Sequence, residues 1–90
     1  MEDFSVIYNG VLTGIDVDLF DNPKGCIVKN LMLYNTNQAQ VQVRLTFDDV
    51  LFIFELQANE YKKLDMLPFT QKIVASGDGV NIHASGLVIT

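Results

Sequence analysis

Closely spaced carboxylates are the residues of this sequence that most resemble a chemical site. The stretch IDVDLFD places Asp16 and Asp18 on one face of a predicted strand, and Asp21 follows in a loop. Calcium takes about six to eight oxygen ligands, usually from several carboxylates on a bent loop. The spacing here does not match the EF-hand pattern. We therefore interpret the three aspartates as a solvated acidic face and expect no metal and no cofactor.

Two other side chains could act as a base or a nucleophile. His83 is the only histidine, and no nucleophile-elbow sequence accompanies it. We expect it on the surface or in an interface. Cys26 is the only cysteine, which rules out an intrachain disulfide and a cysteine zinc site. We expect Cys26 to be a small buried residue in a strand.

Glycine turns and carboxylate pairs give no stronger case for catalysis. Residues 77–79, Gly-Asp-Gly, have no predicted helix behind them, which a phosphate site needs. The chain has no tryptophan, and this weakens both a sugar-cleaving cleft and a carbohydrate-binding module. We predict that the protein has no catalytic residues and is not an enzyme.

The charge balance limits the partners. Six Lys and Arg stand against 11 Asp and Glu, for a formal net charge of −5. Nucleic acids and anionic membranes attract basic faces, so we expect neither as a direct partner. The start of the chain, MEDFSVIYNG, is acidic where a signal peptide is basic, and no apolar run is long enough to span a membrane. These features predict synthesis and assembly in a reducing cytoplasm.

Size and hydrophobicity point towards association. We predict one domain over residues 1–90, because a single core serves a chain of this length. Hydrophobic residues make up 49% of the sequence, more than one small core easily hides. We therefore expect a homo-oligomer or a stable partner.

Alternating polarity and frequent turn residues predict an all-β fold. Val41, Val43, Leu45 and Phe47 alternate with polar residues, as in a half-buried strand. Turns are predicted at 21–25, 35–38, 48–49, 58–60 and 77–79, and Pro68 is placed near the start of a strand. The expected strands cover residues 5–12, 15–20, 26–34, 39–47, 51–56, 61–65, 69–76 and 80–89. This spacing is typical of a single antiparallel β-sandwich, Ig-like or jelly-roll-like, of about seven to eight short strands.

The stretch FDDVLFIFELQ, residues 47–57, is apolar on both predicted faces. Phe52, Phe54 and Leu56 would face the core, which leaves Leu51 and Ile53 on the other side. We predict that Leu51 and Ile53 form a subunit interface. Two alternatives are burial on both faces within one chain and coverage by an N-terminal arm drawn from residues 1–25. The apolar residues of that arm are assigned to the interface set as well: Phe4, Ile7 and Tyr8.

The second half of the chain resembles small virion structural proteins of tailed bacteriophages. The similarity covers about residues 30–89 and includes NTNQAQVQVRLTFDD, FELQANEYKKLD and IVASGDGVNIHASGLVI. The matching residues are Asn35, Val41, Val43, Leu45, Ala58, Asn59, Glu60, Leu64, Asp65, Asn81, Ser85 and Gly86. The resemblance implies a β-sandwich that multimerises on a capsid or at a head–tail junction, without catalysis.

Two classes of function follow from this sequence. The first is a virion structural protein: a capsid decoration or cement protein that contacts the major capsid protein or other virion proteins, or a neck or tail accessory protein. The second is a monomeric module that binds sugars or peptides.

Overall fold

The computed structural model describes residues 2–65 and 69–90, which form seven antiparallel strands and no helix within those ranges. The strands are β1 (Glu2–Val11), β2 (Val17–Asn35), β3 (Val41–Phe47), β4 (Val50–Leu56), β5 (Tyr61–Asp65), β6 (Phe69–Ser76) and β7 (Val80–Ile89). The all-β antiparallel prediction is confirmed. Pro68, predicted near a strand start, lies outside the described residues.

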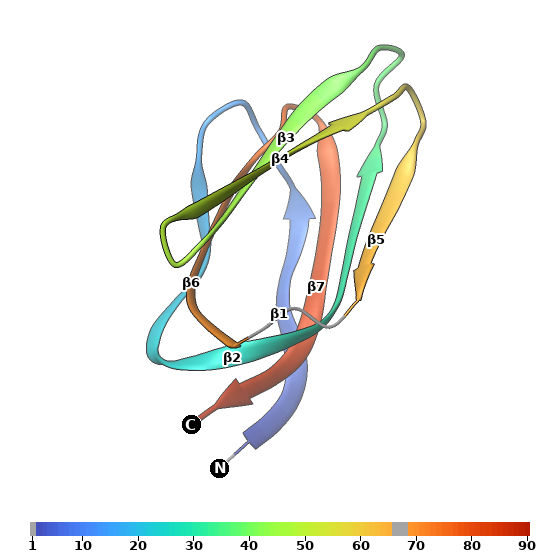
Figure 1. Cartoon of the computed structure of the whole chain (residues 1–90). Helices are drawn as coiled ribbons and strands as arrows, with labels where there is room; N and C mark the ends of the chain where they lie inside the picture. Colours follow the sequence, from blue (N-terminus) through green and yellow to red (C-terminus); the bar gives the residue numbers. More distant parts are fainter. Residues whose placement is uncertain (1, 66–68) are drawn as a thin grey trace.

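One continuous sheet folds over to make two layers (Figure 1). The strand order is β1-β7-β2-β6-β3-β4, and β5 also pairs with β2. The C-terminal half of β2 pairs with β7 and β5, whereas its N-terminal half pairs with β6. β2 therefore belongs to both layers and joins them.

The change of partner occurs at a bulge in β2. Asp21 pairs with Lys72 and Cys26 pairs with Thr70, so residues 22–25 lie opposite Gln71 alone. The sequence predicted that residues 21–25 form a turn between two strands. Instead the strand continues through a bulge, because extra residues on one side of a ladder bend the strand without ending it. Gly25 has a φ of 84°, and a Cβ there would collide with the Phe69 ring.

The core lies between the two layers, and the β3 register is as predicted. Val43 and Leu45 are fully buried, while Val41 and Phe47 pack against the core from its border. Gln42 and Arg44 are exposed on the opposite face. The alternation along this strand therefore assigned the core face correctly.

A polar cluster around Asn35 ties the end of β2 to the loop that follows it and to the end of β4. Its side chain is fully buried, and Nδ2 donates to the carbonyls of Ala39, Leu56 and Gln57 at 2.9, 3.1 and 3.0 Å. Its Oδ1 accepts from the backbone N–H of Asn37 at 2.9 Å. Because a buried amide is costly without partners, these bonds hold the loops at this end in place.

Gly86 marks a close approach of β7 to β2. A Cβ at Gly86 would collide with the Ile27 carbonyl oxygen and lie 2.8 Å from the Lys29 backbone nitrogen. Both are backbone atoms beside a further register shift of β2, between Val28 and Asn30. A rotamer change cannot relieve this contact.

We expect Gly86→Ala to lower the free energy of unfolding by about 3 kcal/mol, because the strands must separate to admit the methyl group. Gly14→Ala is the matched control, since nothing lies within 4 Å of a Cβ there. That variant should differ from the parent by less than about 1 kcal/mol. Urea unfolding of both variants measures the difference, and equal stabilities would contradict this packing of β7 on β2.

Candidate functional site

The β3–β4 turn holds the most engaged carboxylate of the described residues. Asp48 and Asp49 form a two-residue turn and have φ values of 49° and 68°. Positive φ at both positions is the type I′ geometry that suits short hairpins, as the predicted two-residue connection required. Asp48 Oδ1 accepts hydrogen bonds from the backbone N–H groups of Gln71 and Lys72, both at 2.9 Å. The turn is thereby fastened to β6, next to the last β3–β6 pair.

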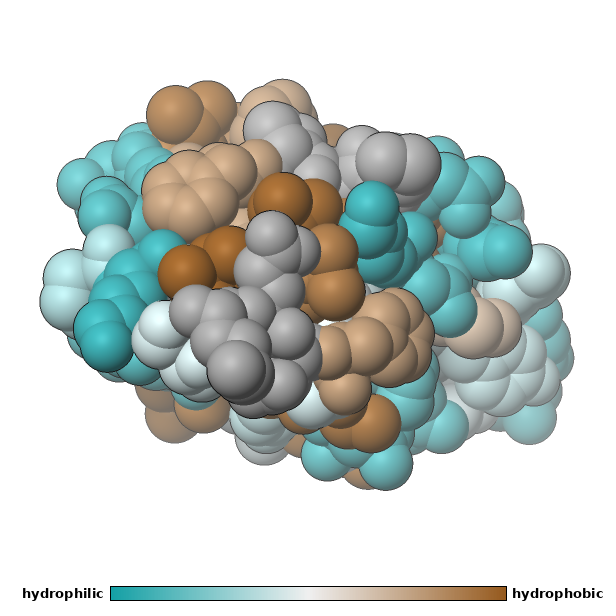
Figure 2. Space-filling model, turned by 90° about the horizontal axis from the view of Figure 1, so that it is seen from below, coloured by the Kyte–Doolittle hydropathy of each residue, from teal (hydrophilic) through white to brown (hydrophobic). Residues whose placement is uncertain are grey.

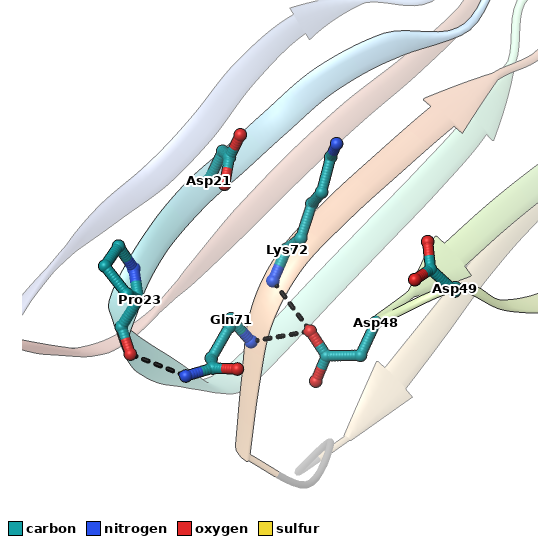
Figure 3. Close-up of a pocket in the computed structure, with 6 residues that line it drawn as sticks. All are labelled: Asp21, Pro23, Asp48, Asp49, Gln71 and Lys72. Atoms are coloured by element: carbon teal, nitrogen blue, oxygen red, sulfur yellow. Dashed lines mark hydrogen bonds between the residues drawn. The ribbon is translucent and has the colours of Figure 1, made fainter.

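Asp48 borders a polar hollow of about 400 Å³, shown in Figure 3. Gln71 Nε2 donates to the Pro23 carbonyl at 2.6 Å and so ties the β2 bulge to β6. The backbone N–H groups of Gln71 and Lys72 lower the pKa of Asp48. A carboxylate held ionised by two N–H donors is a poor proton donor, and these same hydrogen bonds fasten the turn to β6. The full lining of the hollow is Asp21, Pro23, Asp48, Asp49, Gln71 and Lys72.

The other side chains that could act as a base or a metal ligand are not assembled into a site. Asp16, Asp18 and Asp21 are all exposed. Within residues 2–65 and 69–90, no three His, Cys, Asp or Glu side chains are placed to hold a metal ion. His83 is half-buried in β7, and its Nδ1 lies 3.4 Å from the amide oxygen of Asn9.

Cys26 is a core residue, as predicted. Its side chain is fully buried. Burial, with a smaller contribution from the charge of Asp48, raises the pKa of the thiol to about 11. The thiol therefore stays protonated at neutral pH and is a weak nucleophile.

β4 is an edge strand with exposed apolar side chains on both of its faces. It ends the strand order, and β3 is its one partner among the described strands. Leu51 and Ile53 lie on the outer face, as the alternation predicted, and are 42% and 49% exposed. On the inner face Phe52 was predicted to be a core residue, but it is 48% exposed, and Val50 next to the turn is 56% exposed. The strand is thus apolar and exposed on both faces over four consecutive residues.

The N-terminal residues predicted for the interface lie elsewhere. β1 pairs with β7 at the opposite end of the strand order from β4. Residues 2–11 are therefore an edge strand of the sheet and do not cover Leu51 and Ile53. Phe4 is exposed, whereas Ile7 and Tyr8 pack against the core.

An apolar groove opens beside β4 on its inner face, with a volume of about 440 Å³. Lys62 from β5 lies over the Phe54 ring, with Nζ 5.3 Å from the centroid, and the rings of Phe47 and Phe52 are 5.9 Å apart. Apolar residues also gather on the face that Figure 2 views from below. The described residues that line the groove are Phe47, Asp48, Val50, Phe52, Phe54, Leu64, Phe69 and Thr70.

Sequence reasoning missed this groove. Its aromatic residues come from β3, β4 and β6, and their separation along the chain leaves no local pattern. One of its residues could be placed from the sequence: the alternation put Phe52 on the inner face of the strand, which is the face that borders the groove.

Comparisons with known proteins add no relative: the chain matches no family model, no curated protein and no solved structure. Within the described residues, no helix has the length and apolar character needed to cross a membrane.

The Asp48 carboxylate predicts a defined pH dependence. Because its folded pKa is lowered, its contribution to stability is complete above the ordinary aspartate pKa and is lost as the pH falls through the folded value. Asp48→Asn should therefore be less stable than the parent at neutral pH, and the difference should shrink in acid. Asp49→Asn is the control, because it makes the same change in the same turn. Thermal unfolding from neutral to acid pH measures both, and a difference that stays constant with pH would contradict the prediction.

Proposed function

We propose that the protein is a non-enzymatic structural subunit of a tailed-phage virion, specifically a capsid decoration or cement protein. It would bind the major capsid protein or neighbouring virion proteins through apolar surface and stabilise the head. The observation that carries this proposal is the exposure of β4 on both faces, from Val50 to Ile53.

Exposed apolar surface of this kind supports a binding role. Single exposed apolar residues are common, but a run of four on one edge strand is an association surface in a soluble domain. The outer face also carries Arg44, which lies directly opposite Ile53 on β3. A partner therefore meets aliphatic side chains with a cation beside them.

The groups that could have taken part in catalysis are engaged in holding this fold together, which supports a non-enzymatic protein. Asp48 holds a turn, Asn35 holds the loops at one end, and Cys26 lies in the core. The resemblance of residues 30–89 to phage virion proteins is the reason for proposing a virion as the assembly to which the protein binds. A neck or tail accessory role uses the same surface and differs in its position on that particle.

The groove favours a second candidate, a peptide-binding module. Phenylalanine and leucine line most of it, which suits an apolar side chain of an extended peptide better than a sugar. Such a module would act as a monomer and would bind free peptides without a particle.

Particle binding tests the virion role. We expect Ile53→Asp to remain folded, because the side chain is exposed and Arg44 lies opposite, but to lose binding to particles of the encoding phage that lack the protein. Ile15→Asp, the same change at a 78% exposed site outside the predicted interface, is the matched control and should bind normally.

Leu45→Ala provides the comparison for a core position, because this side chain is fully buried. It should lower the free energy of unfolding by about 2–5 kcal/mol. Circular dichroism melts, run beside co-sedimentation with the particles, separate the two effects. Unchanged co-sedimentation of Ile53→Asp would contradict the proposed surface, and failure of the parent protein to bind would contradict the virion role.

A further inference from the structure

The open edge of β4 lacks the features that usually prevent an edge strand from pairing with another chain. Proteins protect edge strands with lysines, prolines, bulges or short strands. β4 has seven residues, VLFIFEL, with Glu55 as its single charge and a regular register along β3. Every pair from Val41–Leu56 to Phe47–Val50 is in sequence, so no bulge interrupts it.

The other two described edge strands do carry such protection. β1 has a register shift between Val6 and Tyr8. β5 is five residues long and contains Lys62 and Lys63. Of the three described edge strands, β4 is therefore the one without such protection.

Hairpin geometry shows which backbone groups of β4 face outward. In a two-residue hairpin the residues that flank the turn, Phe47 and Val50, exchange hydrogen bonds, and such pairs alternate along the ladder. Phe52, Phe54 and Leu56 therefore direct their N–H and C=O groups towards β3. Leu51, Ile53 and Glu55 direct theirs towards the open edge.

We propose that β4 pairs with β4 of a second copy of this chain, antiparallel, about a two-fold axis at Ile53. Each copy then joins its sheet to the other, and the outward groups of Leu51, Ile53 and Glu55 receive partners. The proposal goes beyond the virion role and does not depend on it, because the pairing requires this protein alone.

The self-pairing register follows from the strand itself. A two-fold axis normal to the sheet keeps like faces together, so it passes through a residue position and not between two. Centred on Ile53, the ladder uses all seven residues of β4. Phe52 then lies opposite the partner copy's Phe54, an aromatic pair of the kind that stabilises neighbouring strands, and Leu51 lies opposite Glu55.

Charge selects this register over its neighbours. Centring on Phe52 would place Asp49 opposite the second copy's Glu55, and like charges in that position are destabilising. Centring on Phe54 would move the ladder past the end of β4. With Ile53 at the axis, Asp49 lies opposite Gln57. Glu55 is also turned towards its own chain, where its Oε2 accepts a hydrogen bond from Gln40 Nε2 at 2.7 Å.

The pairing accounts for the exposed side chains on both faces. On the outer face it brings Leu51 and Ile53 of two copies side by side. On the inner face it places a second Phe54 next to Phe52, at the mouth of the groove. Both faces thus lose exposed apolar area when one edge is joined.

The mass of the purified protein in solution tests the pairing directly. Sedimentation should give twice the chain mass of 10.1 kDa for the parent and for the control Ile15→Asp. Ile53→Asp and Ile53→Lys should each give the single-chain mass, because two like charges meet at the axis. Mixing these two variants should restore the doubled mass, because opposite charges then meet there. This rescue also shows that both variants are folded.

Disulfide trapping tests the register. Ile53→Cys should cross-link under mild oxidation, because residues that exchange hydrogen bonds across antiparallel strands lie about 5.5 Å apart at Cα, within disulfide range. Glu55→Cys, also outward-facing, lies opposite Leu51 and should not cross-link. The native Cys26 is buried and does not interfere.

Three results would overturn the proposal. One is a single-chain mass for the parent at every concentration, which would assign the edge to a different protein. Another is no recovery of the doubled mass when Ile53→Asp and Ile53→Lys are mixed. The third is cross-linking of Glu55→Cys as fast as Ile53→Cys. All are measured without particles, so they leave the test of the virion role separate.

Discussion

The bulge in β2 is the constraint on which the rest of the fold depends. A 19-residue strand could run straight, but then its two halves would lie in one flat layer. Four residues opposite Gln71 bend the strand, and Gly25 adopts the positive φ that the bend requires. The bend directs one half of β2 to β6 and the other to β7. Without it, the apolar faces of the two layers would not meet.

Several polar contacts serve to hold that bend and the strands around it. The side chain of Gln71 donates to the carbonyl of Pro23 within the bulge. The Asp48 carboxylate accepts from the backbone N–H groups of Gln71 and Lys72 on β6. Asn22 Oδ1 accepts a hydrogen bond from the Lys24 backbone N–H at 2.9 Å inside the bulge. The hydrogen bonds around the polar hollow of Figure 3 therefore hold the bend of β2 in place. Of the carboxylates that line the hollow, Asp48 is the one whose hydrogen bonds take part in this bracing.

Folding one sheet into two layers leaves edges, and the edges differ. β7 covers one side of β1, and β2 covers one side of β5. Both of these strands carry charges or a register shift, whereas β4 carries four exposed apolar residues in sequence. Hydrophobic side chains that water surrounds on both faces of a strand cost free energy, which a bound partner recovers. The interface proposed for the particle and the pairing proposed between copies both follow from this one strand.

The sequence by itself determined the elements whose signals are local. The alternation from Val41 to Phe47, the two-residue turn at Asp48 and the turn around Asn59, which has a φ of 59°, are all present in the structure. The outward position of Leu51 and Ile53 also followed from alternation alone. Tertiary structure decided what depends on distant partners: the continuity of β2 through residues 22–25, the pairing of β1 with β7, the hydrogen bonds of Asp48 to β6 and the groove beside β4. The physical reason is that side-chain alternation is a property of neighbouring residues, whereas a bulge, an edge or a groove exists only when segments far apart in the chain come together.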